Sequence, residues 1–256
     1  MNINKQLSKV KIPVVVMSTD SYSDVWNHFF ALLEKYWPND SLELYLITET
    51  KIPEIDNVNV VNIKSNNWSG VLLGGLKKIA GQHVILILDD MLIVEKVNQD
   101  LIKKTFNFIQ LNNDIACITI GGNDTTRVEC EYKDNPNFLL VAQDSPFRVT
   151  TSPSIWNKKH LIELIEEGES PWQFELNGTR RAKNNHVFFL NLKKSAIYTF
   201  FTRIGNTAII RGFWQHDAVQ FLESLGQVVN LKLRKVSFKT LPAIWPIVKV
   251  KRFFKR

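Results

Sequence analysis

"VILILDDMLI", residues 84–93, is the stretch that decides the fold. Five apolar residues, Val84 to Leu88, run directly into two adjacent acids, Asp89 and Asp90, after which the apolar pattern resumes. A short apolar run of this kind predicts a buried strand. Because burying two carboxylates without partners is costly, we expect this strand to end at an open edge of a sheet, where both acids reach a crevice.

Strands and helices alternate around this stretch. We expect strands at residues 13–18, 42–48, 57–63, 84–88 and 115–120, with helices at 25–37, 68–79 and 98–111. This alternation predicts an α/β fold in which a mostly parallel central sheet carries flanking helices. Beyond Gly121 we expect shorter strands at 139–142, 147–151 and 184–192, and helices at 155–165 and 214–225.

The charge of the chain is unevenly distributed. Residues 231–256 hold nine Lys or Arg and no acid, whereas the other 230 residues hold 23 basic and 25 acidic ones. The basic character therefore belongs to a C-terminal tail, and the slightly acidic body argues against a nucleic-acid-binding protein. Length allows one large α/β domain or two small ones.

No targeting or metal-binding pattern is evident in the sequence. Cys117 and Cys130 have no spacing that suits zinc, and a reducing interior is the simplest interpretation. The N-terminus lacks the apolar region of a secretory signal, and no run of about 18 apolar residues predicts a membrane-spanning helix. We therefore expect a cytoplasmic protein.

Three polar clusters follow predicted strands: Thr19–Ser21, Asn66–Ser69 and Asp89–Asp90. Ligands of open parallel sheets bind beyond the carboxyl ends of the strands, so we expect these clusters to line one crevice. The alternative for the acidic pair is that it caps the following segment or lies in a loop.

Three stretches, "VVVMSTDSYSDVWNHFFALLEKYWPND", "NNWSGVLLGGLKKI" and "VILILDDMLI", resemble in their order the nucleotide-sugar half of GT-A glycosyltransferases. More narrowly, they are similar to bacterial family-2-like enzymes of surface-polysaccharide assembly (capsule, lipopolysaccharide or O-antigen). The later "SPSIWNKKHLIELIEEGESPWQFELNGTRRA" resembles the acceptor half of this group. The resemblance implies one Rossmann-like GT-A domain over residues 1–230, with a nucleotide-sugar half at 13–120 and an acceptor half at 121–230.

The resemblance also implies which residues bind the donor. The loop after the first strand would meet the base or ribose through Thr19 and Asp20, and the segment before the second helix would approach the nucleotide through Trp68 and Ser69. Asp20 can equally be a turn cap, and Trp68 can equally belong to the core.

Asp89 and Asp90 occupy the place of the family's metal-binding DxD motif, in which a cation neutralises the leaving diphosphate. Position 91 is methionine, so the strict spacing is missing. The resemblance still implies Mg²⁺ or Mn²⁺ held by Asp90, with Asp89 near the ribose or sugar, and metal independence is the alternative. His216 in "FWQHD" is a second candidate ligand, although a histidine at a helix start is more often structural.

An inverting transferase needs a carboxylate to deprotonate the acceptor hydroxyl. Glu175 in "SPWQFE" is our choice and Glu169 the runner-up; the alternative for Glu175 is a cap or an ion pair with Arg180 or Arg181. Trp172 is expected to stack on an acceptor sugar, and Arg180 and Arg181 to reach a diphosphate.

The tail, residues 231–256, interleaves apolar and basic side chains in "LPAIWPIVKVKRFFKR". This composition suits an anionic membrane surface, although the tail can also pack on its own domain or dock a partner. The leading hypothesis is a glycosyltransferase at the cytoplasmic membrane face that acts on a glycan or lipid-linked acceptor. Its alternatives are a non-catalytic nucleotide-binding scaffold and a sugar-nucleotide nucleotidyltransferase; the latter usually carries a glycine-rich loop where this chain has "STDSYSD".

Overall fold

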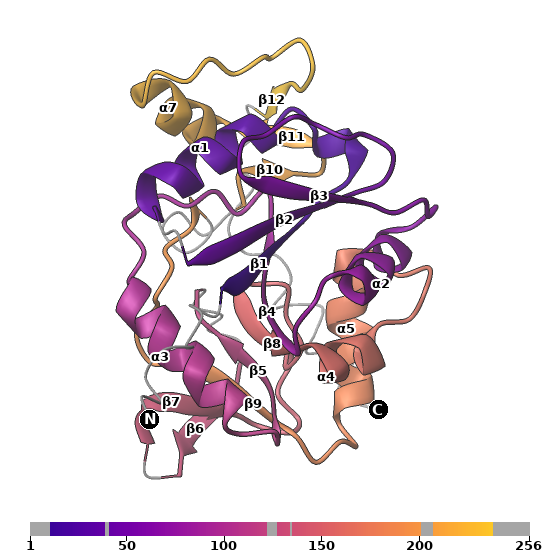
Figure 1. Cartoon of the computed structure of the whole chain (residues 1–256), viewed down its shortest axis with the longest axis vertical. Coiled ribbons are helices and arrows are strands. Elements are labelled where there is room, and N and C mark those ends of the chain that lie inside the picture. Colours follow the sequence, from indigo (N-terminus) through magenta and orange to yellow (C-terminus); the bar gives the residue numbers. More distant parts are fainter. Residues whose placement is uncertain (1–10, 39–40, 122–126, 134, 201–206, 238–256) are drawn as a thin grey trace, which may run out of the picture.

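The computed structural model of the chain describes residues 11–38, 41–121, 127–133, 135–200 and 207–237. Its centre is a nine-stranded sheet with the strand order β3-β2-β1-β4-β8-β5-β9-β7-β6 (Figure 1). The strands are β1 (Ile12–Met17), β2 (Leu42–Thr48), β3 (Val58–Asn62), β4 (His83–Leu88), β5 (Ile115–Thr119), β6 (Glu129–Tyr132), β7 (Asn135–Val141), β8 (Ser154–Asn157) and β9 (Phe188–Leu192).

Seven of these nine strands run in one direction. The strand β1 pairs in parallel with both β2 and β4, β2 with β3, and β5 with β9. Only β8, between β4 and β5, and β7, between β9 and β6, run the opposite way. The prediction of a mostly parallel central sheet is therefore confirmed. All six residues of β1 are buried, as expected for a strand covered on both faces.

Helices cover both faces of the sheet, as predicted. The helices α1 (Trp26–Tyr36) and α3 (Gln99–Gln110) pack on one face, and α2 (Trp68–Lys78), α4 (Lys158–Leu164) and α5 (Pro171–Ala182) pack on the other (Figure 1). Each face has its own hydrophobic cluster, since alternate residues of β1 point to opposite sides: Val14 and Val16 belong to one cluster, and Val15 and Met17 to the other.

The helix α2 forms despite Gly74 and Gly75, and close packing explains why both glycines are tolerated. A Cβ atom added to Gly75 would lie 2.4 Å from the side chain of Ile47 in β2, and one added to Gly74 would lie 2.6 Å from Ile63. The missing side chains let the helix approach the sheet directly. Asn67 caps the N-terminus by accepting a hydrogen bond from the Gly70 N–H.

Several elements after Gly121 differ from the prediction. Residues 155–157, predicted as helix, belong to strand β8, and the helix α4 begins only at Lys158. Residues 147–151 form no strand, while Pro171–Ala182, not predicted as a helix, forms α5 behind a capping box of Ser170 and Gln173. The predicted helix at 214–225 begins at His216, because Phe213–Gln215 is a strand.

A small second sheet lies beside α1 at one end of the molecule (Figure 1). It comprises β10 (Ile209–Ile210), β11 (Phe213–Gln215) and β12 (Val236–Ser237), and helix α7 (His216–Ser224) follows β11. Arg211 and Gly212 join β10 to β11 with φ values of 52° and 81°, as a tight hairpin turn requires. The first part of the predicted basic tail, residues 231–237, thus leads into this sheet and ends in its strand β12; residues 238–256 lie outside the described residues.

Within the described parts of the chain, every helix is too short or too polar to cross a lipid bilayer.

Candidate functional site

The strand order of the central sheet reverses between β1 and β4. From β1 the chain moves outward to β2 and β3, whereas β4 borders β8 and the other half of the sheet. Such a reversal separates the connections that leave the two strands and opens a crevice at their carboxyl ends, where ligands of α/β sheets bind. Ser18, Thr19 and Asp20 follow β1 at this edge, and Asp89 and Asp90 follow β4.

Asp89 joins the two loops at this edge. Its carboxylate accepts a hydrogen bond from the Ser18 hydroxyl, which in turn accepts one from the indole N–H of Trp26 at 2.6 Å. Asp89 is 4% exposed, and burial together with the charge of Asp90 raises its pKa well above the ordinary value. The structure therefore places Asp89 as the buried group that connects the loop after β1 to the end of β4.

Asp90 has a different environment. Its backbone carbonyl accepts a hydrogen bond of 3.0 Å from the Ala208 N–H, which holds the loop against the small sheet. Its Oδ1 atom is buried and has no hydrogen-bond partner among the described residues. Burial raises the pKa of Asp90 to about 7. Burying a carboxylate oxygen without a hydrogen-bond partner costs free energy, and a cation bound to that oxygen would offset the cost.

The described residues contain no group of three His, Cys, Asp or Glu side chains positioned to hold a metal ion. This does not conflict with Mg²⁺, which is often held by one or two carboxylates together with substrate phosphates and water. Asp90 fits that limited role. His216 is exposed at the start of α7, and its neighbour Gln215 donates a backbone hydrogen bond to Ala208, the residue bonded to Asp90.

A contact between Tyr22 and Arg234, near the two aspartates, was not predicted from the sequence. The ring of Tyr22 lies under the guanidinium of Arg234, 4.5 Å from its carbon. Burial, followed by the negative charges of Asp90 and Asp89, raises the pKa of Tyr22 to about 12. Arg234 is 8% exposed and also donates to the carbonyl oxygens of Ser21 and Gly212. It thereby ties the loop after β1 to the small sheet.

Asp20 holds the loops after β1 and β2 together. Its carboxylate accepts hydrogen bonds from the N–H groups of Glu49, Thr50 and Lys51, and its own N–H donates to the carboxylate of Glu49 at 2.8 Å. Burial would raise the pKa of Asp20, but these hydrogen bonds outweigh it and lower the pKa. The alternative of a turn cap therefore describes Asp20 in this structure.

Thr19 and Glu49 also lie in these loops, and both residues are partly exposed. The Thr19 hydroxyl lies 2.8 Å from that of Ser21. Glu49 was missed by the sequence analysis, although it follows β2 directly, as Asp89 follows β4. The position of Glu49 directly after a predicted strand is the sequence signal that would have identified this residue.

Trp68 and Ser69, which were predicted to contact the donor, lie in the packing between α2 and α5. Trp68 is 8% exposed and packs on Phe174, with ring centroids 5.8 Å apart. Ser69 has no exposed surface; it donates its N–H to the Glu169 carbonyl and accepts from the Glu169 N–H. The core alternative for Trp68 therefore describes both residues.

Glu175 lies against the segment that leads into β8. Its Oε1 atom accepts hydrogen bonds from the N–H and hydroxyl of Thr151, at 2.6 and 2.8 Å, and from the hydroxyl of Thr150. Because β8 runs antiparallel to β4, its first residue pairs with Leu86 and the preceding segment reaches the edge that carries Asp89. One turn before Glu175, Trp172 is 40% exposed and packs on Phe147.

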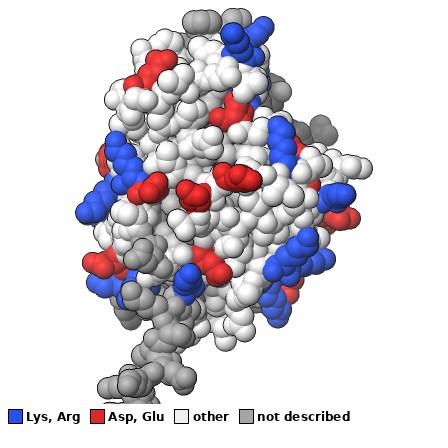
Figure 2. All heavy atoms as spheres, turned by 45° about the horizontal axis from the view of Figure 1, so that its top comes forward, with Lys and Arg blue, Asp and Glu red and all other residues white. Residues whose placement is uncertain are grey.

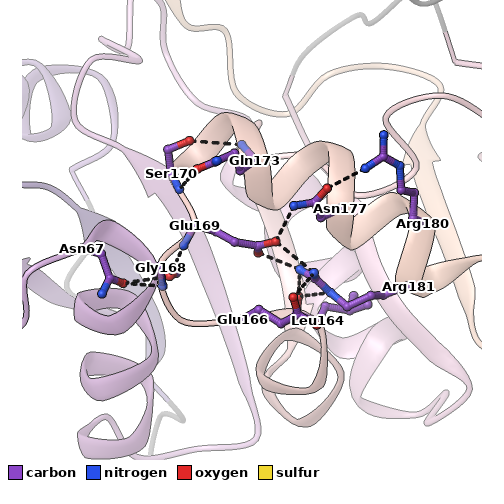
Figure 3. Close-up of polar contacts among 11 residues, drawn as sticks. Asn67, Leu164, Glu166, Gly168, Glu169, Ser170, Gln173, Asn177, Arg180 and Arg181 are labelled. Carbon is purple, nitrogen blue, oxygen red and sulfur yellow. Dashed lines mark hydrogen bonds and ion pairs between the residues drawn. The ribbon is translucent and has the colours of Figure 1, made fainter. Parts of the chain in front are cut away.

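The two arginines predicted to reach a diphosphate have partners within the α4–α5 region (Figure 3). Arg181 pairs with Glu169 at 2.7 Å and Glu166 at 3.0 Å, and it donates to the Leu164 carbonyl. Burial would raise the pKa of Glu169, but Arg181 and Asn177 outweigh it and lower the pKa. Arg181 and Glu169 therefore form a structural ion pair, while Arg180 is exposed and donates to Asn177.

Comparisons with known proteins give structural likeness alone. No family model matches the chain, and no curated protein matches it. A crystal structure of S. aureus TarS 1–349 is 18% identical, with a TM-score of 0.49, and covers 73% of this chain; this chain spans 60% of that one. A complex of TarS 1–349 with UDP-GlcNAc gives a TM-score of 0.46 at 17% identity, over 73% and 58% of the two chains. The bifunctional IspDF from Campylobacter jejuni gives 0.36 at 11% identity, over 68% and 46%.

Proposed function

We propose that this protein is a glycosyltransferase that moves a sugar from a nucleotide-sugar donor to a glycan or lipid-linked acceptor of cell-surface polysaccharide. One observation carries the proposal: Ser18 after β1 and Asp89 after β4 meet at the reversal of the strand order, with Asp90 beside them. This is the edge at which an α/β sheet binds nucleotides. The sequence resemblance to GT-A enzymes points to the same residues.

The donor would lie along this edge, between the loop that carries Thr19 and Glu49 and the acidic pair. Asp90, with His216 as a second candidate ligand, would hold Mg²⁺ or Mn²⁺. When bound, such a cation neutralises charge on a diphosphate. The buried Oδ1 atom of Asp90, which has no hydrogen-bond partner among the described residues, supports this assignment.

Glu175 is proposed as the base of an inverting transfer. Its carboxylate would take the proton of the acceptor hydroxyl as the acceptor oxygen bonds to the anomeric carbon. The bond from that carbon to the diphosphate breaks at the same time, and its electron pair leaves with the nucleoside diphosphate. Two threonine hydroxyls and one backbone N–H already orient the Glu175 carboxylate, as a positioned base requires.

The acceptor is proposed to lie over α5, where Trp172 is exposed and Phe147 packs beside it. Phe147 adopts a φ of 51°, an uncommon value for a bulky residue, and presents its ring to Trp172. Aromatic faces of this kind suit the apolar faces of sugar rings. Arg180 is the exposed arginine of this region, and we assign it, in place of Arg181, to charged groups of the acceptor.

The proposal also covers partners and location. On the face seen in Figure 2, acidic and basic side chains are interspersed and form no continuous basic surface. The expectation that nucleic acid is not a partner stays a prediction from the slightly acidic composition of residues 1–230. Action at the cytoplasmic membrane face, through an anionic lipid surface, is proposed from the basic sequence of residues 231–256.

Thermal shift with a panel of nucleotide sugars, with and without Mn²⁺, tests the donor site. A ligand at 100 times its Kd adds about 2.7 kcal/mol to the free energy of unfolding. We expect a shift with one nucleotide family that Mn²⁺ increases, and that Asp90→Asn reduces to the metal-free value. His216→Ala reports whether that side chain contributes. If no nucleotide produces a shift under either condition, the proposal fails and a non-catalytic scaffold becomes the better account.

A further inference from the structure

Large hydrophobic side chains are exposed at the start of β11 and in the segment that leads from α7 to β12. Phe213 is 45% exposed, Val228 88%, Leu231 44% and Leu233 71%. These four residues are half of the eight large hydrophobics that are exposed in the described parts of the chain, so exposed apolar surface is concentrated here. We call these four residues the apolar rim. Contiguous exposed apolar groups on a folded protein commonly mark a contact surface.

The rim is held in place by the backbone around it. Asn230 begins a tight turn: its side chain accepts from the Lys232 N–H at 3.1 Å, and its carbonyl accepts from the Leu233 N–H at 3.1 Å. Arg234 then turns inward, is 8% exposed, and donates to the Gly212 carbonyl. With Arg234 anchored inside, Leu231 and Leu233 on this turn remain at the surface.

Phe213 lies on the strand beside this turn. The strand β11 pairs in parallel with β12, and the Trp214 N–H donates to the Lys235 carbonyl at 2.9 Å. The segments 211–213 and 233–235 are therefore adjacent, although about twenty residues separate them in the sequence. This brings Phe213 and Leu233 to the same end of the small sheet.

All charged residues in the sequence segments that carry the rim are basic. Arg211, Lys232 and Lys235 are exposed, and the segments 211–213 and 228–235 contain no Asp or Glu. Figure 2, which turns this end of the molecule towards the viewer, shows separated acidic and basic side chains among uncharged ones, so the excess of cations is a property of the two segments and not of the whole face. Residues 238–256, which follow β12, add six Lys or Arg and no acid. Apolar groups interleaved with cations match an anionic bilayer, where each cation near the surface contributes about 1 kcal/mol.

We propose that the apolar rim inserts into the interface of an anionic membrane, and that Lys232, Lys235 and Arg211 contact its headgroups. Arg234 connects this surface to the candidate site, because the same guanidinium binds Gly212 behind the rim and Asp24 in the loop after β1. The membrane would thus be docked beside the crevice. Only this last consequence, access to a lipid-linked acceptor, rests on the proposed glycosyltransferase function.

Vesicle co-sedimentation of the full chain tests the proposal. Wild-type protein, a Leu231→Ser/Leu233→Ser double variant and a Leu111→Ser control are mixed, without nucleotide, with vesicles of phosphatidylcholine alone or with phosphatidylglycerol in equal amount. Leu111 is a matched control because it is 84% exposed at the C-terminal end of α3. We expect the double variant to bind the anionic vesicles at least about tenfold more weakly than wild type, with the control unchanged.

Each other outcome overturns the proposal. Equal binding by the double variant and wild type would assign membrane contact to residues 238–256 alone. Tighter binding by the double variant would mean that the rim normally covers another part of this chain. Loss of a dimer in sedimentation velocity, with no vesicle binding by wild type, would make the rim an interface between copies. Nucleotide-sugar thermal shifts on the same variants are read separately, so a failed donor site is not mistaken for a failed membrane surface.

Discussion

Asp24 and Arg234 are 210 residues apart in the sequence and form a two-pronged ion pair, with the Nε and Nη2 atoms of Arg234 each 2.9 Å from one carboxylate oxygen of Asp24. Both side chains are largely buried, that of Arg234 at 8% exposure and that of Asp24 at 11%. Burial lowers the pKa of Arg234, but the hydrogen bonds and charge of Asp24 outweigh it and raise the pKa overall. The pair therefore joins the loop after the first strand to the last described segment of the chain.

Removing one partner of this pair should be costly. We expect Arg234→Ala to lower the free energy of unfolding by about 3–5 kcal/mol, because the Asp24 carboxylate is left buried without its countercharge. Urea denaturation measures the change. Arg180→Ala is the control, since Arg180 is exposed and a surface substitution is expected to change stability by about 0.5 kcal/mol or less. A loss below about 1 kcal/mol for Arg234→Ala would show that the pair adds no more than a surface contact.

Removal of the Ser18 hydroxyl should also lower the stability of the protein. It accepts from Trp26 and donates to Asp89, and all three residues are buried. Ser18→Ala should destabilise the protein by about 2–3 kcal/mol, because two buried polar groups lose their partner at once. Ser224→Ala, which removes an exposed hydroxyl near the end of α7, is the control. Similar denaturation midpoints for the two variants would contradict the assignment.

The two aspartates predict how stability depends on pH. Burial raises the pKa of Asp90 to about 7, whereas an aspartate of the unfolded chain titrates near 4. Between those values the folded protein binds more protons than the unfolded chain. The free energy of unfolding should therefore decrease as pH rises from about 4 to about 7.

Asp90→Asn removes one of the groups that bind a proton in the folded protein between about pH 4 and about pH 7. In the presence of EDTA, the variant should show a shallower decrease over that range, by up to about 1.4 kcal/mol per pH unit. The measurement is a series of denaturation curves at fixed ionic strength. Parallel slopes for wild type and variant would mean that Asp90 titrates as an ordinary surface acid.

Two substitutions of Glu175 can separate a structural role of this residue from a catalytic one. A glutamine at this position keeps an oxygen that accepts from the Thr151 N–H, whereas alanine removes it. We expect Glu175→Gln to keep the melting temperature of wild type but to lower turnover by about 10²–10⁴-fold, the usual contribution of a general base. Glu175→Ala should lower both. Retained turnover in the glutamine variant would leave Glu175 as the residue that holds the segment before β8.

Sequence patterns predicted the first half of the fold well, because buried parallel strands read as continuous apolar runs. The runs at 13–18, 42–48 and 84–88 each became a strand, and Asp89 and Asp90 directly follow β4, although Asp89 is buried there. The pattern was misread at "SIWN", residues 154–157, where a four-residue strand runs directly into a helix and apolar periodicity does not mark the change. Helix α5 was missed although Ser170, Pro171 and Gln173 are typical residues of a helix N-terminus.

The candidate site was predictable only where it depends on strand ends. Asp89, Asp90 and Thr19 follow from that rule, and Glu49 would have followed had it been applied to β2. Arg234 and Tyr22 did not follow, because their contact depends on how the small sheet folds back across the loop after β1. The hydrogen bonds of Ser69 and Arg181 with Glu169 were not predicted, because Glu169 lies about 100 and 12 residues away in the sequence, respectively, and local sequence does not show such pairings.

The strand β8 has a consequence for the order in which this chain acquires its structure. It lies between β4 and β5 and bonds to both, so the central sheet stays divided until residues 154–157 are available. During synthesis, the first 120 residues therefore leave the ribosome with one edge of β4 and both edges of β5 uncovered, because β8 and β9 come later in the chain. Exposed apolar edges of this kind favour association with other chains. A chain interrupted before residue 158 is thus expected to be a substrate for chaperones and proteases, and the sheet is complete only once β9 is available as well.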